Sequence, residues 1–130
     1  FSGQFKFKDK KNLLLLLFCL SFGFVEASEK DINESWCSSN QGIVEFRTKD
    51  GTYVDCLINE YAVEAEFDYN WKESIGQSLH YAESTGKKAA ILFIKRSNSN
   101  KNYFLELERV VAEFKLPIKL IIINEESYKQ

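Results

Sequence analysis

Three acidic residues stand in a part of the chain that otherwise has the pattern of buried β-strands. They are Asp55, Glu64 and Glu66, within the stretch "VDCLINEYAVEAEF" from Val54 to Phe67. An ionised carboxylate that is buried without a partner costs several kcal/mol. Such acids therefore need a cation, a network of hydrogen bonds or a solvent-filled cleft.

The spacing of these acids predicts that they converge. Side chains alternate between the two faces of a strand, so Glu64 and Glu66 point the same way. Asp55 lies on the preceding strand and reaches Glu64 if the two strands are neighbours. Carboxylates, completed by a backbone carbonyl and waters, favour Mg²⁺ or Mn²⁺ over zinc. A solvated sheet face that simply carries two glutamates is the alternative.

The elements that position these acids follow from periodicity and turn residues. A first helix has Ser28 or Asp31 as its N-cap and Gly42 as its end, and Asp50-Gly51 marks a hairpin turn. Strands are expected over 42–48, 52–58, 60–67, 87–94 and 118–124, and further helices over 71–85 and 103–114. This order predicts an α/β fold with a mixed central β-sheet flanked by helices on both faces.

The first 27 residues have the pattern of a secretory signal peptide. Lysines precede the apolar run from Leu13 to Val25, and the small Ala27 provides a cleavage site. We therefore expect a cleaved signal over 1–27, a single domain over 28–130, export to the periplasm or medium, and no stable membrane insertion afterwards. An uncleaved anchor is the alternative, although the run is shorter than the ~20 residues that span a bilayer.

Composition limits the partners of this domain. The chain of 130 residues has a formal net charge of −2 at pH 7, which excludes a generally basic nucleic-acid-binding surface. A polyanion would have to be met by a local patch or by bound metal. Cys37 and Cys56 are either a disulfide of an oxidising compartment or two separate buried thiols.

A further pair of residues follows the acidic strand. Gln77 and Tyr81 are four residues apart and so lie on one face of the expected helix. With "DGTYVDCL", "YAVEAEF" and "WKESIGQSLHYA", the chain resembles the PD-(D/E)XK nuclease superfamily, in particular small exported bacterial members of its RecB-like branch. The resemblance covers about Trp36 to Ile94 and implies a restriction-endonuclease-like αβββαβ core.

The resemblance also implies an activity and the residues that perform it. Asp55 and Glu64 would bind the metal, with the Ala65 carbonyl as a third ligand. Gln77 and Tyr81 would brace the site and contact the nucleic acid. The implied reaction is hydrolysis of phosphodiester bonds in DNA or RNA with Mg²⁺ or Mn²⁺.

The chain departs from the family pattern where the motif lysine should stand, because Glu66 occupies that position. A glutamate cannot orient the attacking water as a cation, but it can act as a base or bind a second metal. Lys72 or Lys88 could supply a displaced lysine. Whether the protein is an enzyme therefore stays open, and the alternative is a catalytically inactive relative that serves as a binding or envelope-associated module.

Several other polar residues are candidates for supporting roles. Glu45 and Glu34 could be further acids of the site, whereas the single histidine, His80, is expected to be structural. Four residues flank one strand and form either a local basic patch or two solvated strand ends: Lys87, Lys88, Lys95 and Arg96.

Overall fold

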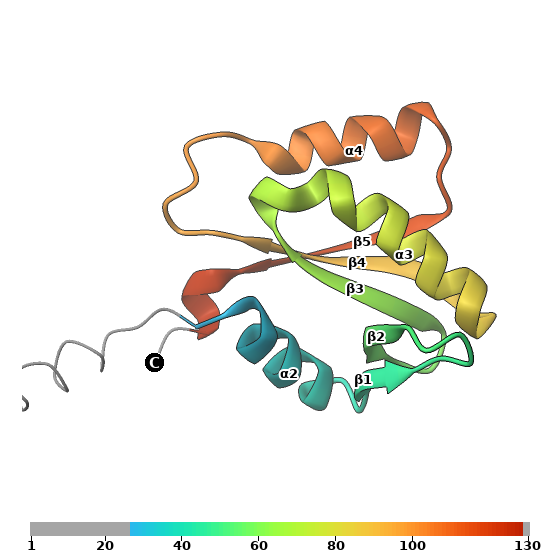
Figure 1. Cartoon of the computed structure of the whole chain (residues 1–130). Helices are drawn as coiled ribbons and strands as arrows, with labels where there is room; N and C mark the ends of the chain where they lie inside the picture. The colour runs from blue at the N-terminus through green and yellow to red at the C-terminus, as the bar shows by residue number, and fades with distance from the viewer. Residues whose placement is uncertain (1–26, 129–130) are drawn as a thin grey trace, which may run out of the picture.

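A computed structural model describes residues 27–128 as an α/β fold (Figure 1). The helices are α2 (Glu29–Ser39), α3 (Trp71–Thr85) and α4 (Tyr103–Glu113), and the strands are β1 (Ile43–Arg47), β2 (Tyr53–Leu57), β3 (Tyr61–Phe67), β4 (Lys88–Lys95) and β5 (Ile118–Asn124). Two short 3₁₀ helices, η1 (Asp68–Asn70) and η2 (Glu125–Tyr128), were not predicted. The α/β class and the order of the main elements are confirmed.

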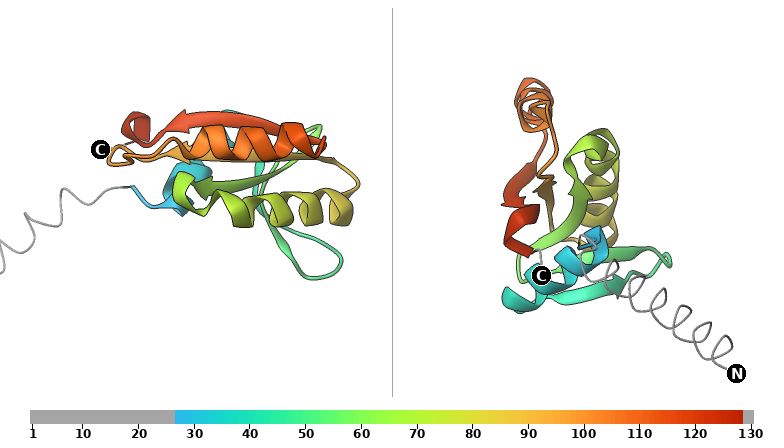
Figure 2. Two further views of the ribbon diagram at one scale, coloured as in Figure 1. Left: turned by 90° about the horizontal axis from the view of Figure 1, so that it is seen from above. Right: turned by 90° about the vertical axis from the view of Figure 1, so that its left-hand side faces the viewer.

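The five strands form one mixed sheet in the order β1-β2-β3-β4-β5. The first three strands are antiparallel, whereas β3, β4 and β5 run parallel and are joined through α3 and α4. Helices α3 and α4 lie on one side of the sheet and α2 lies on the other (Figures 1 and 2). The predicted signal peptide lies outside the described residues except for Ala27. Within 27–128, no helix is both long enough and apolar enough to cross a bilayer.

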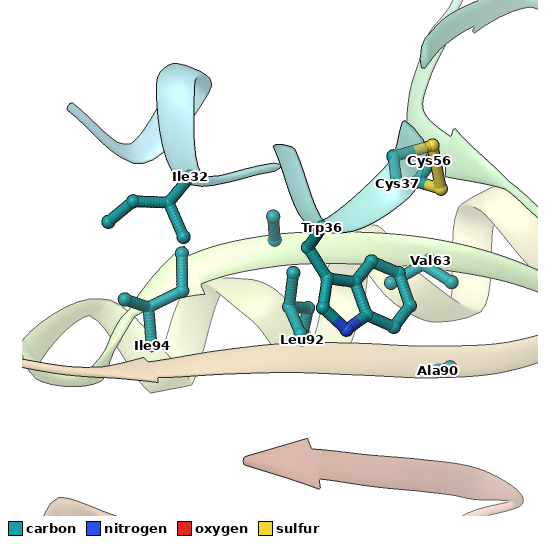
Figure 3. Packing of buried hydrophobic residues seen from close by; sticks show 9 residues of the cluster. Ile32, Trp36, Cys37, Cys56, Val63, Ala90, Leu92 and Ile94 are labelled. Carbon is teal, nitrogen blue, oxygen red and sulfur yellow. A yellow bond between two sulfur atoms is a disulfide. The ribbon is translucent and has the colours of Figure 1, made fainter. Parts of the chain in front are cut away.

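Helix α2 begins at a capping box that identifies Ser28 as its N-cap. The Asp31 N–H donates to Ser28 Oγ at 3.1 Å, and the Ser28 N–H donates to Asp31 Oδ2 at 3.3 Å. One face of the helix then buries Ile32 and Trp36 against the sheet, in a cluster that includes Leu92 (Figure 3). Because this cluster joins α2 to strand β4, α2 is part of the core.

A disulfide between Cys37 and Cys56 joins the end of α2 to β2, with the two Cα atoms 5.7 Å apart (Figure 3). Both cysteines are fully buried in the cluster that α2 covers. Closing a loop of this size contributes roughly 3 kcal/mol in the chain-entropy description. The bond therefore fixes α2 beside the strand that carries Asp55.

Gly42 was expected to end α2, but the structure gives it a different role. The helix ends at Ser39, and the residue that takes the left-handed backbone conformation after it is Gln41, with φ of 55°. A Cβ atom at Gly42 would lie 2.5 Å from Cys37 Sγ and 2.6 Å from Cys56 Sγ. Only glycine leaves room for the disulfide at this point.

Gly42→Ala is therefore expected to destabilise the oxidised protein. The added methyl group must displace two buried sulfurs, and overpacking of this kind costs about 1–3 kcal/mol. Thermal unfolding of oxidised protein measures the change. The matched control is Gly76→Ala on α3, where a Cβ meets no atom within 4 Å; it should stabilise the helix by about 0.5–1 kcal/mol. Equal melting temperatures for Gly42→Ala and the unmutated protein would contradict the assignment.

Candidate acidic site

The acidic residues lie where β2 separates from β3. These strands pair at Cys56 with Val63 and at Leu57 with Ala62, whereas β3 pairs with β4 along its whole length. Continuing the first register places Asp55 opposite Glu64, as the alternation predicted. Past this point the edge of β3 that faced β2 is no longer covered by a strand.

Carboxylates take the place of the missing strand along this edge. The Ala65 N–H donates to Asp55 Oδ2 at 2.8 Å. The Phe67 N–H donates to Glu66 Oε1 at 3.1 Å and to Glu29 Oε2 at 3.3 Å. We call Glu29, Asp55, Glu64 and Glu66 the acid cluster. Since the N–H and C=O of a strand residue point to the same side, the Ala65 carbonyl also faces this edge.

Glu64 is the centre of the acid cluster, with only 2% of its surface exposed. Its carboxyl group is hydrogen-bonded to the side chains of Asp55 and Tyr81. The Gln77 amide is assigned the orientation in which its oxygen and its nitrogen both find suitable partners. In this orientation its nitrogen donates to Glu64 Oε1 at 2.6 Å. The structure thus brings both predicted residues of α3 onto Glu64, with Tyr81 buried and Gln77 at the surface.

Burial and mutual repulsion raise the pKa values of these acids. Burial, followed by the hydrogen bond and charge of Asp55, raises the pKa of Glu64 to about 10. Burial, followed by the hydrogen bond and charge of Glu29, raises the pKa of Glu66 to about 8. Burial also raises the pKa of Asp55, against the hydrogen bonds from Glu64 and Ala65, and burial raises that of Tyr81. At neutral pH Glu64 therefore holds a proton that it shares with Asp55.

No basic side chain of the described residues neutralises the acid cluster. Within residues 27–128, none of its four carboxylates forms an ion pair with a lysine or arginine. Lys72 is exposed and lies over the Trp71 ring, with 5.8 Å between its Nζ and the ring centroid. Lys88 is exposed at the start of β4. Neither lysine takes the place of the missing motif lysine in this structure.

The acid that α2 contributes is Glu29 and not Glu34. Glu34 faces solvent and pairs with Lys30 at 3.9 Å, whereas Glu29 reaches the Phe67 N–H in the first turn of the helix. Asn33, also unpredicted, is buried and donates from Nδ2 to the Asp55 carbonyl at 2.9 Å. A polar residue on the apolar face of α2 was the available signal for Asn33.

The remaining predicted residues lie outside the acid cluster. Glu45 is exposed, with φ of 50°, and its charge adds slightly to the raised pKa of Asp55. His80 lies outside the acid cluster, with its Nε2 3.1 Å from Asp50 Oδ2 of the hairpin turn.

The four basic residues do not form one patch, and the alternative of separate strand ends describes them. Lys87 and Lys88 lie at the start of β4, and Lys95 and Arg96 lie at its end. A strand of that length spans about 26 Å at 3.3 Å per residue. Only the second pair is near the end of β3 that carries Glu66, since Phe67 and Ile94 are paired across the two strands.

The donors of the acid cluster are of the type that Mg²⁺ and Mn²⁺ prefer, which is carboxylate and carbonyl oxygen. Mg²⁺ is usually held by one or two carboxylates together with waters and substrate phosphates. As the side chains stand, no three His, Cys, Asp or Glu residues in 27–128 are grouped to hold a metal ion. Binding would require Glu64 to lose its proton and its hydrogen bond to Asp55.

Comparison of the chain with models of known protein families, with curated proteins and with solved structures found no match. The resemblance to PD-(D/E)XK nucleases therefore depends on the motif residues and on their arrangement alone.

Proposed function

We propose that this protein is a nuclease-like phosphodiesterase that depends on Mg²⁺ or Mn²⁺. The observation that carries the proposal is the convergence of Asp55, Glu64 and Glu66 on one uncovered strand edge, with Gln77 and Tyr81 on Glu64. Four buried or half-buried acids without a basic partner are costly unless protons or a cation compensate them. Perturbed carboxylates of this kind are common in functional sites.

In this proposal, each residue of the cluster has a separate task. Asp55, Glu64 and the Ala65 carbonyl would hold the metal, and Gln77 and Tyr81 would keep Glu64 oriented. The metal would polarise the phosphoryl oxygen and lower the pKa of the attacking water. Glu66, whose pKa is raised to about 8, would accept the proton of that water, in place of the positioning that a lysine provides.

The charges near the site support nucleic acid as the substrate class. Nucleic acid, DNA or RNA, would approach from the end of the sheet where Lys95 and Arg96 lie. The Arg96 guanidinium lies over Phe67, with 4.9 Å between its Cζ and the ring centroid, and its Nε lies 3.8 Å from Glu125 Oε2; these contacts hold the cation beside the residue that follows Glu66. A local contact of this kind suits a chain whose net charge is negative.

We also propose that the domain acts after export, in the periplasm or medium. The disulfide between Cys37 and Cys56 supports this location, because such bonds persist mainly in oxidising compartments.

A specific observation favours the alternative function, in which an inactive relative serves as a binding or envelope-associated module. The position of the motif lysine is occupied by Glu66, and neither Lys72 nor Lys88 lies in the cluster. Such a protein would keep the fold and the acids but would not stabilise the charge that develops in the transition state.

Titration calorimetry with Mn²⁺ on residues 28–130 tests the proposal. We expect binding that releases protons, because the ligands must be deprotonated, and that is lost in Asp55→Asn. The surface variant Glu34→Gln is the control and should bind Mn²⁺ as the unmutated protein does. Absence of binding to the unmutated protein would contradict metal dependence. Binding without cleavage of single- or double-stranded DNA or RNA would favour the inactive relative.

A further inference from the structure

A cavity of about 490 Å³ opens at the carboxyl ends of the parallel strands β3, β4 and β5, beside the start of α4. It lies in the size range of small-molecule sites, about 300–1,000 Å³. In α/β sheets, ligands bind beyond the carboxyl ends of the strands. Residues that line it include Asp68, Phe93, Lys95, Lys101, Phe104 and Asn124. The acid cluster contributes no residue to this lining.

Asp68 is the buried polar group of this cavity, with 1% of its surface exposed. Its Oδ2 accepts hydrogen bonds from the Arg96 N–H at 3.3 Å and from the Ser99 hydroxyl. Its Oδ1 is buried and has no hydrogen-bond partner within residues 27–128. A buried carboxylate oxygen without a hydrogen bond is costly, so this oxygen needs a donor that the described residues do not provide.

Two exposed lysines also line the cavity. Lys95 is exposed and forms no ion pair within residues 27–128, and Lys101 is exposed and pairs with Glu106 at 3.0 Å. Phe93 and Phe104 also belong to the lining and meet edge to face, with ring centroids 5.5 Å apart. The lining thus combines a buried acceptor, aromatic rings and exposed cations.

We infer that this cavity binds a nucleotide whose base carries an exocyclic amino group, with that group donating to Asp68 Oδ1. The base would lie against the aromatic rings of the lining, and the phosphate would meet the exposed Lys95. Uracil presents a carbonyl where cytosine presents the amino group, and this oxygen would face the Asp68 carboxylate.

The inference does not depend on metal-assisted cleavage at the acid cluster. Binding can therefore be measured with EDTA present, because EDTA removes the metal on which the proposed cleavage depends. Asp55→Asn should bind the nucleotide as the unmutated protein does, so failure of the nuclease proposal and failure of this inference can be distinguished.

The experiment is calorimetric titration of residues 28–130 with CMP and UMP, which differ at the amino group. CMP is expected to bind at least about tenfold more tightly, because UMP leaves Asp68 unsatisfied. Asp68→Asn, which can donate as well as accept, should remove this preference. Lys95→Ala should weaken CMP binding several-fold and leave cytidine binding unchanged, since cytidine has no phosphate.

Two results would overturn the inference. One is the absence of CMP binding at millimolar concentration. The other is a result in which the unmutated protein binds CMP and UMP with equal affinity and Lys95→Ala binds CMP as tightly as the unmutated protein does. Lys95 is an exposed side chain at the end of a strand, so its variant should fold even if Asp68→Asn does not.

Discussion

Glu64→Gln is expected to raise the melting temperature of the metal-free protein at pH 8 by about 8 °C or more, on the scale of 4–8 °C per kcal/mol for a domain of this size. Glutamine has the shape of the protonated acid and can donate to Asp55 as that acid does. The variant keeps the hydrogen bonds of the cluster without the need to retain a proton.

The direction follows from the difference between the folded and unfolded states. Glu64 has a folded pKa raised to about 10 from an ordinary value of 4.5, so the folded state keeps a proton that the unfolded state loses above pH 4.5. The contribution of Glu64 to stability is therefore fully present below pH 4.5 and is lost as the pH rises toward 10, by up to about 1.4 kcal/mol per unit. Glu66, with its pKa raised to about 8, adds to the loss between pH 4.5 and 8.

Thermal unfolding from pH 5 to pH 8 in EDTA measures this effect. The gap between Glu64→Gln and the unmutated protein should widen with pH, whereas the surface variant Glu34→Gln should follow the unmutated protein throughout. A melting temperature of the unmutated protein that stays level or rises over this range would show that Glu64 does not retain its proton. Added Mn²⁺ should stabilise the unmutated protein in proportion to the logarithm of its concentration, but not Glu64→Gln.

Glu66→Lys is expected to increase cleavage of nucleic acid by about 10²-fold, the usual contribution of one well-placed group that stabilises transition-state charge. The change restores the Glu-x-Lys arrangement of the nuclease motif at a position that faces Glu29 and Asn70. Mn²⁺ should bind more weakly, because the cluster loses one carboxylate and gains a cation. Cleavage of a labelled oligonucleotide at saturating Mn²⁺ separates the two effects.

Two further variants decide whether Glu66 or a displaced lysine governs cleavage. Glu66→Ala should reduce both metal stabilisation and any cleavage, and Lys72→Ala should change neither, since Lys72 lies over Trp71 at the surface. The reverse result, in which Lys72→Ala abolishes cleavage and Glu66→Ala has no effect, would assign the role to Lys72.

Local patterns were enough to predict how the acids are placed on their strands. The period of two along "YAVEAEF" put Glu64 and Glu66 on one face, and Asp50-Gly51 set the hairpin that brings β2 beside β1. The four-residue spacing of Gln77 and Tyr81 placed both on the helix face that meets Glu64. Each of these relations depends on residues close together in the chain or on adjacent strands.

The contributions from distant segments could not be predicted in this way. Glu29 meets Glu66 because of how α2 packs across the sheet. The periodicity of a helix shows which face is buried but does not show how the helix is oriented on the sheet. Asp68 fell in the connection between the predicted strand 60–67 and the predicted helix 71–85, where the 3₁₀ turn after β3 directs it toward Ser99, in the loop before α4. The reason for Gly42 was equally hidden, because the disulfide that excludes a side chain there joins two different elements.

The bond between Cys37 and Cys56 has a consequence for the order in which the site is completed. Cys37 lies one helical turn beyond Asn33, which holds the Asp55 carbonyl, and Cys56 is the residue next to Asp55. In a reducing compartment α2 loses this covalent link, and its local opening becomes easier by up to roughly 3 kcal/mol. Glu29 then leaves the acid cluster and Asn33 leaves the Asp55 carbonyl more often, so the four acids are assembled for a larger fraction of the time where the thiols oxidise.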